Sequence, residues 1–127
     1  MSAYLLDTTF LIRFLRKDRA AVAWLRKRAA EGDVVACSTI NVAEVFAGMR
    51  EHEAEATEAF LSALRCIPVT FEIARQAGRW RESFRAAGRE LSLPDALIGA
   101  TALLRDMTLV TDNKKDFPLR GLRFAAP

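Results

Sequence analysis

The sequence has one histidine, two cysteines and no long hydrophobic run. No apolar stretch approaches the roughly 20 residues that a membrane-spanning helix needs, so we expect no membrane segment. The N-terminus has no basic region ahead of its apolar residues, which is not typical of a signal peptide. Two cysteines do not indicate a disulfide framework. We therefore expect Cys37 and Cys66 to be reduced thiols in the core of a cytoplasmic protein.

The single histidine, His52, lies in a charged stretch, where we expect a surface position. This placement counts against mechanisms that depend on a histidine general base. The sequence also lacks low-complexity tracts, internal repeats and linkers, and its 127 residues are 51% hydrophobic. We therefore predict a single domain over residues 1–127 with its own core.

Strand and helix patterns alternate along the chain. Short apolar runs predict strands at residues 3–6, 34–37, 66–69 and 108–111, with a short fifth strand at 122–124. Helical patterns cover residues 9–15, 19–31, a segment capped by Ser38 or Thr39, and residues 51–64, 71–88 and 94–104. This alternation indicates a layered α/β fold with a mainly parallel sheet. Right-handed crossovers would place the carboxyl ends of its strands on one edge.

Four carboxylates, far apart in the sequence, lie where these strands and helices meet. Asp7 closes the first apolar run, and Asp95 follows Pro94 in the first turn of a helix. Glu44 lies among apolar residues on its helix, where a buried carboxylate would need a partner. Asp116 follows the fourth strand. All four can meet at the carboxyl edge of a parallel sheet, where sites form in such folds.

Carboxylates gathered at one point repel each other and therefore need a cation. A ligand set of oxygen atoms without cysteine or histidine indicates a hard ion, Mg²⁺ or Mn²⁺. This design is typical of a metal-dependent phosphodiesterase. Two alternatives stay open. Asp7 and Asp95 would also suit helix starts without any ligand, and Asp112 competes with Asp116 for the fourth place.

The charge distribution suits a polyanionic substrate. The chain carries 19 basic and 16 acidic residues, a net charge of +3. If the four acids share one pocket, the remaining surface carries 19 basic and 12 acidic groups, a net charge of +7. An acidic pocket in a basic surface suits a nucleic acid that meets a cation at its scissile phosphate. A mild basic excess is also common in soluble proteins generally.

The segments around the four acids together carry a resemblance that covers nearly the whole chain. They are DTTFLI at 7–12, TINVAEVFAG at 39–48, LPDALIGATA at 93–102 and LVTDNKKDF at 109–117. In order and context they resemble the PIN-domain ribonucleases, and the short chain is similar to the VapC toxins of bacterial toxin–antitoxin pairs. The resemblance implies a three-layer α/β/α fold with a central parallel sheet of about five strands. It also implies Mg²⁺-dependent RNA cleavage, a homodimer, and a VapB-type antitoxin whose C-terminal segment covers the acidic pocket.

The family's four acids map onto Asp7, Glu44, Asp95 and Asp116. We predict that Asp7, Asp95 and Asp116 bind the metal ion, and that Glu44 orients or deprotonates the attacking water or helps bind a second ion. Further residues are predicted to assist these four. Thr9 and Asn113 would orient the metal ligands by hydrogen bonds, and Arg13, Arg16 and the arginines of residues 71–88 would hold the RNA backbone.

Rival interpretations fit the sequence less well. A haloacid-dehalogenase-like phosphatase needs a second aspartate two residues after the first, where this chain has Thr9. A response-regulator receiver needs an acidic pair before its first site, where Leu5 and Leu6 precede Asp7. The remaining alternative is a degenerate PIN-like binding module without nuclease activity.

Overall fold

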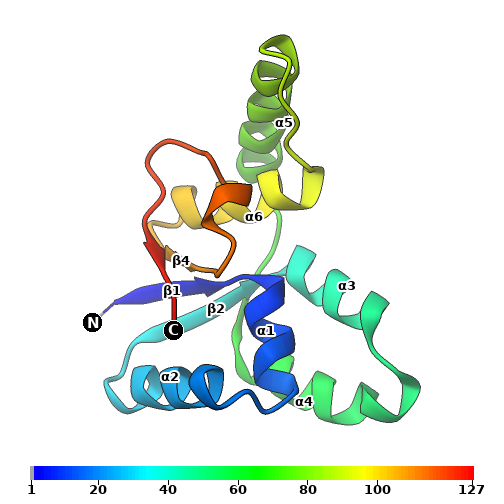
Figure 1. Cartoon of the computed structure of the whole chain (residues 1–127), viewed down its shortest axis with the longest axis vertical. Helices are drawn as coiled ribbons and strands as arrows, with labels where there is room; N and C mark the ends of the chain where they lie inside the picture. Colours follow the sequence, from blue (N-terminus) through cyan, green and yellow to red (C-terminus); the bar gives the residue numbers. More distant parts are fainter. Residues whose placement is uncertain (1) are drawn as a thin grey trace.

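A five-stranded sheet lies between two layers of helices in the computed structural model, which describes residues 2–127 (Figure 1). All neighbouring strands pair in parallel, in the order β3-β2-β1-β4-β5. The strands are β1 (Ala3–Leu6), β2 (Val34–Ser38), β3 (Arg65–Ile67), β4 (Thr108–Val110) and β5 (Phe124–Ala125). The predicted α/β/α fold with five strands is confirmed.

Six α-helices connect these strands. They are α1 (Thr8–Leu15), α2 (Arg19–Ala30), α3 (Thr39–Gly48), α4 (Ala54–Ala63), α5 (Phe71–Ala86) and α6 (Leu93–Leu104). Two short 3-10 helices, η1 (Glu51–Glu53) and η2 (Lys114–Asp116), complete the described elements. In Figure 1, α1, α2 and α4 lie below the strands, and α5 and α6 lie above them.

Adjacent residues of each central strand belong to different hydrophobic clusters. Leu5 packs in the cluster beneath α5 and α6, whereas Leu6 packs in the cluster of α1 to α4. Leu109 and Val110 divide in the same way, because successive side chains of a strand point to opposite faces. A parallel sheet that is covered on both faces needs apolar residues on both, which explains the unbroken apolar runs in the sequence.

The two cysteines have different environments. Cys37 is buried as predicted, and burial, with the neighbouring Cys66 thiol, raises its pKa to about 12. The prediction that Cys66 also lies in the core is wrong, because Cys66 is exposed on the edge strand β3.

The bounds of two strands differ from the predictions. The third strand spans Arg65–Ile67 rather than 66–69, and the fifth lies at Phe124–Ala125 rather than 122–124. No helix in residues 2–127 is long and apolar enough to cross a membrane, as predicted.

The strand order reverses at β1, which has β2 on one side and β4 on the other. The crossovers from β1 to β2 and from β1 towards β4 therefore leave the sheet in opposite directions. In open α/β sheets, ligands bind outside the carboxyl ends of the strands at such a reversal of strand order. Asp7 lies at this point, directly after β1, and its backbone N–H donates to the carbonyl of Val110 (3.0 Å).

Candidate active site

Asp7 is held at the carboxyl end of β1 by the neighbouring strand rather than by the helix that it precedes. Its side chain is buried and accepts a hydrogen bond from the Thr111 hydroxyl (2.6 Å). Although Asp7 occupies the N-cap position of α1, its carboxylate makes no capping hydrogen bond. The carboxylate is thus not consumed by a capping role, which favours the functional interpretation of this residue.

Burial raises the pKa of Asp7 above the ordinary value of 3.8. The Thr111 hydroxyl and the nearby N–H groups of Thr8 and Thr9 act in the opposite direction, and the charge of Glu44 raises the pKa further. Burial outweighs the hydrogen bonds, so Asp7 holds its negative charge in an unfavourable environment. A nearby cation would relieve this cost.

Glu44 is positioned by a chain of hydrogen bonds that begins at the end of β2. The backbone N–H of Ser38 donates to Asn41 Oδ1 (2.8 Å), and Asn41 Nδ2 donates to Thr8 Oγ1 (2.9 Å). The Thr8 hydroxyl then donates to Glu44 Oε1 (2.6 Å). Asn41 is fully buried, so it can serve only internal partners. The chain ties the half-buried Glu44 to the residue that follows Asp7.

Asp95 reaches the same edge from the opposite helical layer. It lies in the first turn of α6, whose N-cap Ser92 accepts a hydrogen bond from the Asp95 backbone N–H (3.2 Å). Burial raises the pKa of the Asp95 carboxyl, the Ser92 hydroxyl lowers it, and the charges of Asp116 and Asp7 raise it again. Asp95 thus lies within electrostatic range of both Asp7 and Asp116.

Asp116 closes η2 after β4 and is exposed. Within residues 2–127, no ion pair includes Asp7, Glu44, Asp95 or Asp116. Nor do three acidic, histidine or cysteine side chains in that range lie close enough to hold one ion unaided. If these acids bind an ion, they would do so as an open group of oxygen ligands rather than as a closed cage. Such a group fits Mg²⁺ or Mn²⁺, because Mg²⁺ keeps several waters and needs only one or two carboxylates.

Asp112, the alternative fourth acid, has a different environment. Its carboxylate pairs with Arg13, and the same guanidinium donates to Asp18 (3.0 Å) at the start of α2. Asp112 is thus neutralised by a cation of the chain itself, whereas Asp116 has no such partner among the described residues. This contrast favours Asp116 as the fourth acid of the site.

The assisting residues that we predicted have mixed positions. Thr9 is exposed, and its hydroxyl makes no hydrogen bond within residues 2–127. Asn113 contributes its backbone N–H, which donates to Thr111 Oγ1 (3.0 Å) and so steadies the hydroxyl that holds Asp7. Arg13 is engaged by two aspartates, whereas Arg16 is exposed beside a hollow between α1, α3 and α4. Their roles toward metal and RNA stay predictions.

Sequence reasoning missed three positioning residues, Thr8, Asn41 and Thr111. Each is a polar residue placed directly after a strand or in the first turn of the next helix. Asn41 also completes a capping box with Ser38, a pattern that is visible in the sequence. Polar residues beside acids at strand ends were the signal that could have found them.

Comparisons with known proteins agree with this arrangement. The profile of the PIN domain matches residues 4–120, a range that contains all four acids. The chain belongs to the PIN-domain family. Ribonuclease VapC19 of Mycobacterium tuberculosis is 39% identical over 115 residues, which cover 91% of this chain and 92% of that protein. The PIN-domain chain is therefore of the VapC type.

Solved structures support the same assignment. A chain in a toxin–antitoxin complex from Klebsiella pneumoniae is 33% identical, with a TM-score of 0.73 over 93% of this PIN-domain chain and 92% of its own. A chain of VapBC2 from Rickettsia felis, bound to a DNA fragment from the promoter, has a TM-score of 0.86 over 98% of both chains. At 24% identity, this second likeness shows the fold alone.

Proposed function

We propose that this protein is a divalent-metal-dependent endoribonuclease and the toxin of a VapBC-type toxin–antitoxin pair. The observation that carries the proposal is the gathering of Asp7, Glu44, Asp95 and Asp116 at one sheet edge without any basic partner in residues 2–127. The curated relative named a ribonuclease supports RNA as the substrate. A binding module without catalysis would gain nothing from mutually repelling, partly buried carboxylates.

Asp7, Asp95 and Asp116 would hold the ion, directly or through water. A bound Mg²⁺ would neutralise these charges, polarise the scissile phosphate and lower the pKa of a coordinated water. Asp7 and Asp95 must be ionised to bind it, and both carry raised pKa values. We therefore expect metal affinity to fall on acidification at a higher pH than ordinary aspartates would give.

Glu44 would act on the attacking water. Its Oε1 accepts the Thr8 hydroxyl, which leaves the second carboxylate oxygen to orient the water or accept its proton. Thr8 receives a hydrogen bond from Asn41, so its own proton is directed at Glu44. In-line attack by the water on the phosphorus breaks the bond to the 3′ oxygen. The products would carry 5′-phosphate and 3′-hydroxyl ends.

Basic side chains beside the acids would hold the RNA. Lys114, Lys115 and Arg120 line a shallow hollow that also includes Phe117 and Phe124 around η2. Lys114 and Lys115 immediately precede Asp116, so a phosphate at the acids would lie close to two ammonium groups. Exposed Arg16 is the C-cap residue of α1, the helix that follows Asp7. Such contacts position the backbone without reading sequence.

A VapB-type antitoxin is the proposed partner. An apolar groove of about 600 Å³ between α1, α2 and α4 offers a surface for it. Phe14 and Phe60 stack in this groove with ring centres 4.3 Å apart, and Lys17, Arg19 and Arg26 also line it. A segment with apolar and acidic side chains would fit this lining. Homodimerisation stays a prediction that light scattering of the purified protein would test.

Cleavage of RNA by the purified protein tests the main proposal. We expect cleavage with Mg²⁺ or Mn²⁺, none with EDTA, and none with Asp7→Asn or Asp95→Asn. Asp106→Asn is a matched control, because that carboxylate is exposed just beyond the far end of α6. Equal cleavage by all samples would reject metal-dependent catalysis by these residues. Mn²⁺ titration calorimetry separates the degenerate alternative, which should bind no ion at the acids.

A further inference from the structure

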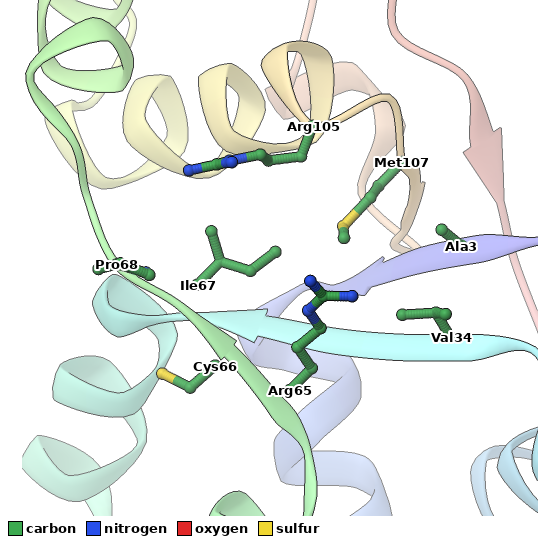
Figure 2. A pocket seen from close by; sticks show the side chains of 8 residues that line it. All are labelled: Ala3, Val34, Arg65, Cys66, Ile67, Pro68, Arg105 and Met107. Atoms are coloured by element: carbon green, nitrogen blue, oxygen red, sulfur yellow. The ribbon is translucent and has the colours of Figure 1, made fainter.

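A pocket that none of the four acids lines lies beside the edge strand β3 (Figure 2). It has a volume of about 470 Å³ and is lined by the first residues of β1 and β2, by β3 and Pro68 after it, and by residues between the end of α6 and β4. Its apolar part comprises Ala3, Val34, Ile67, Pro68 and Met107. None of the residues assigned to cleavage above lines this pocket.

Two arginines supply the charge of this pocket. Figure 2 shows the side chain of Arg65 rising from β3 toward the middle of the pocket, and the side chain of Arg105 running along the rim beneath the end of α6. Cys66 lies between Arg65 and Ile67 on the strand, and its thiol points away from the pocket centre in the same view. Alternation along β3 thus directs Arg65 and Ile67 to the pocket side.

Neither arginine has an acidic partner in the pocket. No acidic residue lines it, and no ion pair or side-chain hydrogen bond within residues 2–127 includes Arg65 or Arg105. By contrast, Arg13, Arg28 and Arg123 each have a carboxylate within 4 Å. Glu72, in the first turn of α5, lies within electrostatic range of Arg105 but does not line the pocket. A bound anion would add a counter-charge inside the pocket itself.

The geometry points to a phosphate group of a nucleotide as the ligand. A guanidinium presents a planar fork that matches phosphate oxygens in a two-pronged hydrogen bond. Two guanidinium groups that line one pocket can each contribute such hydrogen bonds to a phosphate bound there. The apolar floor of Ile67 and Met107 can accept the flat face of a base, which a simple anion would leave exposed. The pocket volume lies within the range of about 300–1,000 Å³ that small-molecule sites show.

We propose that this two-arginine pocket binds the phosphate of a nucleotide, either free or at the end of an RNA strand. The pocket is separate from the acid site. Arg105 lies ten residues beyond Asp95 along α6, which corresponds to about 15 Å at 1.5 Å per residue. One phosphate therefore cannot reach both sites, and binding in the pocket does not depend on cleavage.

Direct binding measurements on the full chain test this proposal without any nuclease step. Calorimetry would compare inorganic phosphate, a nucleoside 5′-monophosphate and a short RNA with a 5′-phosphate, all without divalent metal. The variants are wild type, Arg65→Gln/Arg105→Gln, and the matched control Arg50→Gln/Arg89→Gln, which removes two exposed arginines that have no assigned role. Because Arg65 and Arg105 are exposed, circular dichroism should show an intact fold in all three.

We expect the pocket double variant to bind the monophosphate at least about tenfold more weakly than wild type, as loss of charge-assisted hydrogen bonds requires. The control should differ by less than about threefold. Tighter binding of the RNA than of the monophosphate, lost in the pocket variant, would identify the RNA end as the source. Equal affinity of wild type and the pocket variant for all three ligands would overturn the proposal. Because metal is absent, a failed cleavage assay would leave this result unaffected.

Discussion

Two regions of the same sheet carry side chains of opposite charge. At the carboxyl edge, Asp7 and Asp95 are partly or fully buried, and no basic side chain in residues 2–127 pairs with them. Beside β3 and the amino ends of β1 and β2, Arg65 and Arg105 line one pocket that no acid lines. No ion pair within residues 2–127 includes these acids or these two arginines. Both regions are suited to charged ligands, a cation at one and an anion at the other.

Helix α6 connects these two regions and helps to explain the difference. Its first turn carries Asp95, where the positive end of the helix dipole favours an acid, and Arg105 lies at its C-cap, where the dipole favours a base. The strands are all parallel, so their carboxyl ends meet on one side, where Asp7 follows β1.

The largest expected effect comes from moving a positive charge to the acid edge. Asp95→Lys would place an ammonium group beside Asp7 and Asp116, where it would substitute for the metal ion. Loss of an outer-shell partner of a metal already costs about 10- to 100-fold, so we expect RNA cleavage to fall by more than about 100-fold. Mn²⁺ binding in calorimetry should disappear as well. Retained metal binding with a folded variant would show that Asp95 is not part of the ion site.

A smaller loss is expected from breaking the hydrogen-bond chain to Glu44. Thr8→Val removes the hydroxyl that donates to Glu44 Oε1 and leaves Asn41 without its acceptor. Hydrogen bonds to charged groups contribute about 1.5–3 kcal/mol, which corresponds to a decrease in kcat of roughly 10- to 100-fold. Thr8→Ser keeps the hydroxyl and should restore most of the activity.

Thr9→Val serves as a comparison for that experiment. Its hydroxyl is exposed and makes no hydrogen bond in residues 2–127, so we expect a smaller decrease than for Thr8→Val. If Thr9→Val proves the more damaging change, the role predicted from the sequence is right and the contact of Thr8 is secondary. Single-turnover rates at saturating Mg²⁺ would decide between them.

The acids of the site were predictable from sequence, whereas their supporting contacts were not. Asp7 and Asp95 follow an apolar strand and open an apolar helix, and such local patterns are visible in a linear sequence. The contact of Thr111 with Asp7 joins residues 104 positions apart, and it depends on β1 lying beside β4. No periodicity reports which of two adjacent threonines faces inward. The sequence alone therefore does not decide between Thr8 and Thr9.

The exposure of Cys66 could not be predicted from the sequence for a similar reason. Its short apolar strand looks the same in sequence as the central strands, but β3 lies at the sheet edge. The two-arginine pocket was invisible as well, because Arg65 and Arg105 are 40 residues apart and meet only through the order of the strands. Strand order is a tertiary property, and short-range patterns contain no record of it.

A smaller effect is expected on the thermal stability of the protein when Asp95 loses its charge. The pKa of Asp95 is raised in the fold by burial and by Asp116 and Asp7, so the folded state binds protons more readily than the unfolded chain. The free energy of unfolding therefore falls as the pH rises from the pKa of Asp95 in the unfolded chain, near 3.8, through its raised pKa in the folded state. At neutral pH, Asp95→Asn should raise Tm by a few degrees, on the order expected when a site is relieved of strain.

Two controls make that prediction specific. The Tm advantage of Asp95→Asn should vanish when the pH is lowered below the pKa of the unfolded chain, because Asp95 is then neutral in both states. Added Mg²⁺ should raise the Tm of wild type but not that of the variant, since only the native acids bind the ion. An Asp95→Asn variant that is less stable than wild type at pH 7 would contradict the repulsion among the acids.

The smallest effect is expected at Asp112, the carboxylate that already has a partner. Asp112 is half-exposed on its side chain and pairs with Arg13, so Asp112→Asn removes a surface ion pair between α1 and the loop after β4. Such pairs contribute little, and the variant should retain RNA cleavage within about threefold of wild type. Asp116→Asn changes the same chemical group four residues later and should lose cleavage by more than about tenfold. A larger loss at Asp112 than at Asp116 would mean that the Arg13 pair opens when metal binds and that Asp112 is the fourth acid.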